Sequence, residues 1–62
     1  MNVLRIAFVD IWDTFPIETV MNYFKPEYSP IIDNENPEII FYSCFGVEHL
    51  KYKKGIRVFF NR

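Results

Sequence analysis

The sequence predicts a small α/β domain: a mostly parallel, Rossmann-like sheet of about four strands with one main helix and one short helix. Residues 37–46 (PEIIFYSCFG) form a nearly continuous apolar run between a proline and a glycine, typical of a strand covered on both faces. A second apolar run at residues 3–11 (VLRIAFVDI) is rich in β-branched residues and precedes a helical pattern. A strand, a helix and a further strand in this order favour a right-handed crossover and parallel pairing.

The first strand is predicted over residues 3–11 and leads into the acidic and capping residues of 10–14 (DIWDT). Arg5 interrupts its apolar pattern early, so we expect this side chain to reach out at the end of the strand. Such an exit is typical of a parallel strand that continues into a loop and then a helix.

The main helix is predicted over residues 14–24. Asp13 or Thr14 can serve as its N-cap, and Pro16 suits its first turn. One apolar stripe at spacing i, i+3, i+4, i+7 would pack on the sheet, and it consists of Ile17, Val20, Met21 and Phe24. Pro26 ends the pattern.

The rest of the chain supplies three more elements. A short strand at residues 28–33 has Pro30 near its start, which indicates an edge strand. The run at 37–46 is then a central strand, although a buried helix is the alternative reading of its apolar pattern. Residues 47–54 indicate one or two helical turns, and 56–60 (IRVFF) a fourth strand. We expect the first and third strands inside the sheet.

Composition limits the class of protein. The 62 residues allow a single domain, 1–62, and half of them are hydrophobic, so we expect part of this surface to be covered by a further domain or by a second copy in a homo-oligomer. The net charge of −1 gives no support for nucleic-acid binding, and no apolar run approaches the roughly 20 residues of a membrane span. A single cysteine excludes an internal disulfide, so Cys44 is predicted to be a small core residue. Without a leader pattern, we expect a cytoplasmic protein.

Candidate binding residues gather where the strands end. The carboxyl ends of parallel strands form the site of open α/β sheets, and the loops at 10–14, 43–47 and 61–62 would meet there. A sugar fits this set: Trp12 for a ring face, Asp13 for hydroxyl groups, and Asn61 as a further polar contact. The alternative is that Asp13 caps the helix and Trp12 packs in the core.

Other kinds of site lack their motifs. There is no glycine-rich phosphate loop, and His49 has no partner at ligand spacing, so we predict a surface or helix-packing histidine and no metal site. Ser43 and Cys44 have no histidine base at a recognisable spacing. Asp10 and Asp13 resemble the acidic pair of a phospho-receiver domain, but the third strand ends in Ser-Cys-Phe where that fold needs an aspartate. We therefore assign no catalytic or cofactor-binding residue.

The order of three segments resembles the α-1,3-fucosyltransferases of glycosyltransferase family 10. These segments are RIAFVDIW at 5–12, ENPEIIFYSCFG at 35–46 and HLKYKKGIRVFF at 49–60. The resemblance implies the amino-terminal, acceptor-side half-domain of a two-domain GT-B enzyme. Such an enzyme transfers fucose from GDP-fucose, bound by a carboxyl-terminal donor domain, to an N-acetylglucosamine-containing glycan.

The sequence departs from this family where the resemblance places the catalytic base. The family's glutamate lies in a T-G-E-N segment after the fourth strand, whereas residues 59–62 read Phe-Phe-Asn-Arg. We therefore expect a truncated fragment that is inactive alone, and we leave open whether the chain counts as an enzyme. The competing hypothesis is a stand-alone interaction module that self-associates or binds a protein partner.

Overall fold

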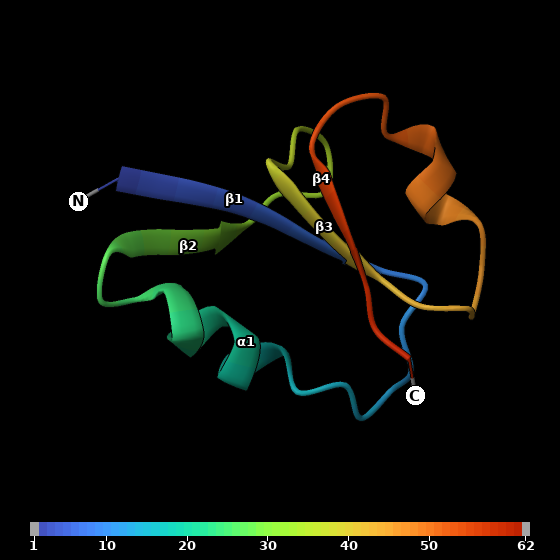
Figure 1. Ribbon diagram of the computed structural model, residues 1–62, viewed down its shortest axis with the longest axis horizontal. Coiled ribbons are helices and arrows are strands. Elements are labelled where there is room, and N and C mark those ends of the chain that lie inside the picture. The colour runs from blue at the N-terminus through green and yellow to red at the C-terminus, as the bar shows by residue number, and fades with distance from the viewer. Residues whose placement is uncertain (1, 62) are drawn as a thin grey trace.

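The computed structural model describes residues 2–61 and shows one parallel sheet with a helix and a 3₁₀ turn (Figure 1). The strand order is β2-β1-β3-β4, so the first and third strands lie inside as predicted. The α/β class is also confirmed. In chain order the elements are β1 (Asn2–Val9), α1 (Ile17–Phe24), β2 (Tyr28–Ile32), β3 (Ile39–Tyr42), the 3₁₀ turn η1 (Glu48–Lys51) and β4 (Ile56–Phe59).

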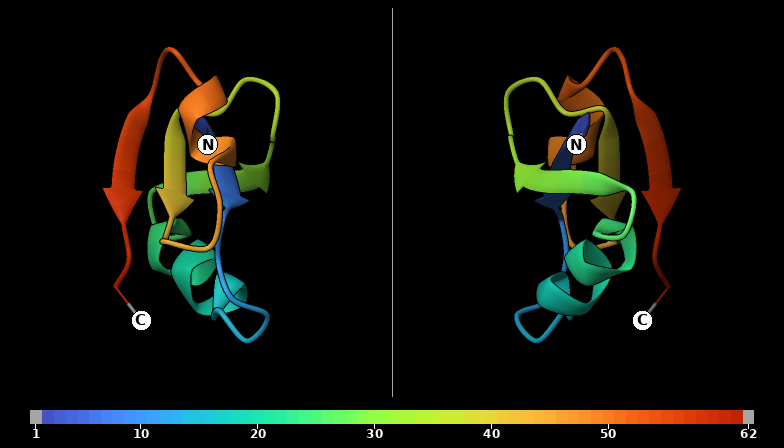
Figure 2. Two further views of the ribbon diagram at one scale, coloured as in Figure 1. Left: turned by 90° about the vertical axis from the view of Figure 1, so that its right-hand side faces the viewer. Right: turned by 90° about the vertical axis from the view of Figure 1, so that its left-hand side faces the viewer.

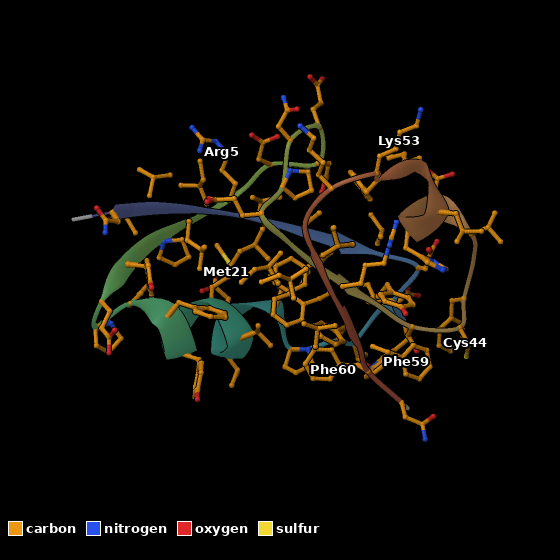
Figure 3. The ribbon with its side chains drawn as sticks, turned by 45° about the horizontal axis from the view of Figure 1, so that its top comes forward. Arg5, Met21, Cys44, Lys53, Phe59 and Phe60 are labelled. Atoms are coloured by element: carbon orange, nitrogen blue, oxygen red, sulfur yellow. The ribbon has the colours of Figure 1, made fainter. Side chains whose placement is uncertain are left out.

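The inner strands are covered on both faces. On one face Leu4 and Ile6 of β1 pack with Phe41 of β3 under α1, and Figure 3 shows Met21 between that helix and the sheet. On the other face Ala7 and Ile40 pack against Tyr52, the residue that follows η1. The apolar run at 37–46 has no polar face because β3 lies between these two clusters, so it is a strand as predicted.

The segment between β2 and β3 crosses β1 in only a few residues. Residues 2–6 of β1 pair with β2, whereas residues 6–9 pair with β3 on the other side. Because β3 starts at the level where β2 ends, the chain needs no returning helix. The crossing segment is tied to β1 through main-chain bonds from Asp33 to Ile6 and from Glu38 to Arg5. Arg5 therefore lies along the strand, where its guanidinium is 3.6 Å from the carboxylate of Asp33.

The helix starts later than the sequence predicted. Its N-cap is Pro16, with no side-chain capping bond, so the prediction of Asp13 or Thr14 as the cap is wrong. The main chain turns first, with the Phe15 N–H donating to the Trp12 carbonyl, and Pro16 keeps Phe15 out of the helical region. From the predicted stripe, Val20, Met21 and Phe24 do pack on the sheet.

The crossover from β1 to β2 and the crossover from β3 to β4 lie on opposite faces of the sheet. Helix α1 connects β1 to β2 on one face, and η1 connects β3 to β4 on the other, as the two separate clusters show. Figure 2 shows β4 at the outer edge beside β3, and β2 forms the opposite edge as its proline predicted. The chain after β1 adds its next strand, β2, on one side of β1, whereas the chain after β3 adds β4 on the opposite side of the sheet. The order of strands therefore reverses between β1 and β3, and this is the topological switch point where open α/β sheets bind ligands.

Candidate functional site

Two loops meet at the switch point, and they leave the carboxyl ends of β1 and β3. Figure 1 shows the blue segment after β1 and the gold segment after β3 at the same end of the sheet. The Phe45 N–H donates to the Asp10 carbonyl at 3.2 Å, so the loops are joined directly. Of the three segments predicted to converge, 10–14 and 43–47 do so. Asn61 does not line the pocket beside them, and residue 62 lies outside the described residues.

Asp10 holds the second loop through its side chain as well. Its carboxylate accepts hydrogen bonds from the Glu48 N–H at 3.1 Å, the His49 N–H at 2.8 Å and the His49 Nδ1 at 2.6 Å. We call these three bonds the Asp10 clasp. Asp10 has a φ of 56°, a left-handed conformation that Asp and Asn adopt more readily than other non-glycine residues. Gly46 lies so close to the same carboxylate that a Cβ at this position would overlap Asp10 Oδ1.

The clasp determines the electrostatics of this end of the sheet. The Asp10 side chain is only 3% exposed. Burial acts to raise the pKa of Asp10, but hydrogen bonds from the His49 main chain, the His49 ring and the Glu48 main chain outweigh it and lower the pKa below its ordinary value. The site therefore contains a buried aspartate that is ionised at neutral pH.

His49 differs from its predicted role. Its ring binds Asp10 through Nδ1 and stacks on Tyr42 with the ring centroids 4.2 Å apart. The sequence predicted a surface or helix-packing histidine with no partner at metal-ligand spacing, whereas the structure places the ring, with its side chain 17% exposed, against Asp10 and Tyr42. Asp10 lies 39 residues earlier in the chain and reaches His49 only when η1 folds back over the end of β1. Gly46 is a signal that could have indicated this close approach.

A pocket of about 420 Å³ opens beside the two loops, within the usual range of about 300–1,000 Å³ for ligand sites. We call it the Trp12 pocket, and it is lined by Ile11, Trp12, Asp13, Thr14 and Phe45. The Trp12 and Phe45 rings are 6.2 Å apart, and the Trp12 ring also contacts the Phe15 ring at 5.0 Å. An aromatic wall, one carboxylate and one hydroxyl thus share a concave surface.

The structure brings together two of the three predicted binding residues. Trp12 and Asp13 both line the pocket, whereas Asn61 is exposed after β4 and is not part of its lining. The sequence did not indicate Ile11, Thr14 and Phe45 individually as binding residues. Phe45 carries no chemical motif, and only the folded loops show that it faces Trp12.

The remaining polar and sulfur groups nearby form no reactive pair. Cys44 is exposed at the periphery of the molecule (Figure 3), so the prediction of a core cysteine is wrong. It lies beyond the end of β3, where the chain has left the covered part of the sheet. Ser43 is buried, and its Oγ has no hydrogen-bond partner within residues 2–61, so no base activates it there.

The part of the chain that the structure describes contains neither a metal site nor a membrane-spanning helix. Residues 2–61 contain no group of three or more His, Cys, Asp and Glu side chains that could hold a metal ion. Over the same residues, no helix has the length and hydrophobicity needed to cross a membrane.

The fold and the pocket define the chain as a doubly wound α/β unit with a ligand-sized pocket at its switch point. The family model for the N-terminal domain of alpha-(1,3)-fucosyltransferase (FucT) matches residues 6–62. Since this match covers nearly the whole sequence, the chain belongs to the FucT N-terminal domain family. No curated protein and no solved structure matches it significantly.

Proposed function

We propose that this domain binds the glycan acceptor of a fucosyltransferase, with a sugar ring of an N-acetylglucosamine-containing glycan in the Trp12 pocket. The observation that carries the proposal is the pairing of an aromatic wall with the Asp13 carboxylate on one concave surface at the switch point. The apolar face of a pyranose can pack on the Trp12 ring while its hydroxyls donate to Asp13.

The donor substrate belongs to another part of the proposed enzyme. GDP-fucose would be bound by a carboxyl-terminal donor domain, as the resemblance to family 10 implies. The 62 residues hold no counterpart of the family's T-G-E-N glutamate, so they offer no base in that position for the acceptor hydroxyl. We therefore expect these residues alone to bind the acceptor but to transfer no fucose.

Saturation-transfer NMR on the 62-residue chain tests acceptor binding. With N-acetyllactosamine as the probe, we expect saturation of the sugar C–H protons, and we expect none with GDP-fucose. Trp12→Ala should abolish the signal. Tyr23→Ala is the matched control, because Tyr23 is an aromatic residue with 82% of its surface exposed and lies outside the Trp12 pocket. An equal signal in Trp12→Ala, or no signal in the unaltered chain, would overturn the proposal.

A second candidate function is a module that associates with itself. Large apolar side chains are exposed on η1 and on the edge strand β4, with exposed fractions of 65% at Leu50, 66% at Ile56 and 52% at Phe59. Such side chains, together with the unpaired edge of β4, favour pairing with another chain. Light scattering over a wide concentration range tests this function, since a monomer at every concentration would contradict it.

A further inference from the structure

We propose that Asp10 is a positioning residue for the sugar pocket, because it holds Phe45 opposite Trp12. This inference rests on the proposed function, in which the Trp12 pocket receives the acceptor. Asp10 does not line the pocket itself. It would act through the loop that it holds, and loss of the clasp would open the pocket on the Phe45 side.

Asp10 connects both walls of the pocket through the main chain and the side chain. Ile11 and Trp12 follow it directly in sequence, so its backbone conformation sets where they point. Its carbonyl accepts the Phe45 N–H, and its carboxylate accepts the N–H groups of Glu48 and His49. The segment from Phe45 to His49 is therefore fixed at both ends by one residue.

Phe45 depends on this attachment because little else holds it. Its side chain is 51% exposed, and its ring contact within the described residues is with Trp12, 6.2 Å away. A core residue such as Phe41 keeps its position through packing on several rings, as its contacts with Phe8, Phe24 and Phe60 show. Phe45 has no comparable packing, so its hydrogen bond to Asp10 and the clasp determine where its ring lies.

His49 and Gly46 support the same geometry. The His49 ring lies between Tyr42 and the Asp10 carboxylate, which orients the carboxylate toward the loop. Gly46 leaves the space that Asp10 Oδ1 occupies. A side chain at position 46 would displace the Asp10 carboxylate without changing any charge. Such a variant therefore tests the hydrogen bonds of the clasp separately from the charge of Asp10.

The chain offers a matched control for removal of the clasp. Asp33 is also a carboxylate that accepts two main-chain N–H groups, those of Glu35 and Asn36, each at 3.0 Å. It lies between β2 and β3, beyond the Trp12 pocket, and its pKa is likewise lowered, chiefly by the Asn36 and Glu35 bonds. Asp33→Asn therefore makes the same change, from a charged carboxylate to a neutral amide that keeps one acceptor oxygen, without touching the loops of the switch point.

The test compares Asp10→Asn with Asp33→Asn by NMR on the 62-residue chain. In Asp10→Asn we expect the nuclear Overhauser contacts between Trp12 and Phe45 to disappear and the dissociation constant for N-acetyllactosamine to rise about tenfold or more. In Asp33→Asn both should stay unchanged. Retained Trp12–Phe45 contacts in Asp10→Asn, or an equal loss in Asp33→Asn, would overturn the inference.

Two further variants apply if Asp10→Asn does not fold. His49→Ala removes one bond of the clasp, and Gly46→Ala displaces the carboxylate, so each should weaken the Trp12–Phe45 contacts while the signals of Ile6 and Ile40 stay in place. Unchanged contacts in both would overturn the inference. Failure of the proposed function is distinguishable, because an unaltered chain that binds no saccharide still shows whether the Trp12–Phe45 contacts depend on Asp10.

Discussion

Replacing Ile40 with alanine should destabilise the protein far more than the same replacement at Ile56. Ile40 is fully buried against Ala7 and Tyr52, whereas Ile56, at the start of the edge strand β4, is 66% exposed. Truncating a buried isoleucine to alanine costs about 2–5 kcal/mol. At Ile56, which keeps only about a third of its surface from water, the same truncation should cost about 1 kcal/mol or less of unfolding free energy.

The size of the domain makes this difference decisive. At about 0.05–0.15 kcal/mol per residue, a chain of this length has a free energy of unfolding of roughly 3–9 kcal/mol. Ile40→Ala therefore removes a large part of the free energy of unfolding. It should lower the urea midpoint by roughly 2 M or more, if the unfolding free energy falls by about 1 kcal/mol per M of urea. Urea titration followed by Trp12 fluorescence gives both midpoints. Equal costs at the two positions would refute the burial of β3 on the face that Tyr52 covers.

Two other perturbations test single contacts of the fold. Burial acts to raise the pKa of Asp10, but hydrogen bonds from His49 and Glu48 outweigh it, so the pKa in the folded state is lower than the ordinary value. The stabilisation of the fold by ionised Asp10 is therefore complete above the ordinary pKa and is lost as the pH falls through the lower folded pKa. The difference in unfolding free energy between the unaltered chain and Asp10→Asn should therefore shrink in acid, and a constant difference from neutral pH to below pH 3 would contradict this. Tyr52→Phe removes a hydroxyl that donates to the Asn34 carbonyl at 2.6 Å and should cost about 1 kcal/mol in thermal unfolding. An equal loss in the exposed control Tyr23→Phe would contradict it.

The sequence predicted the sheet well because the hydrophobic pattern of each strand, and the order of the elements along the chain, can be recognised from short stretches of sequence. The unbroken apolar run at 37–46 indicated coverage on both faces, and Pro30 indicated an edge, as the structure shows. How β2 and β3 are placed along β1, which makes their connection across β1 so short, was not predicted. This placement is a stagger of the two strands, which no residue pattern specifies.

The site was predicted only in part, for a similar reason. Trp12 and Asp13 could be placed because both follow directly after a strand whose end was recognisable. The Asp10–His49 pair joins residues 39 positions apart and forms only when η1 folds over the end of β1. The N-cap prediction failed because Pro16 restricts Phe15, and this local effect outweighs the capping preference of Asp13 and Thr14.

The most direct test of acceptor binding at the switch point is an amide NMR titration of the chain with N-acetyllactosamine and, separately, with GDP-fucose. We predict shifts confined to residues 10–14 and 43–47 with the acceptor and no shifts with GDP-fucose. Shifts centred elsewhere on the sheet, or a folded spectrum that neither ligand changes, would contradict acceptor binding at the Trp12 pocket.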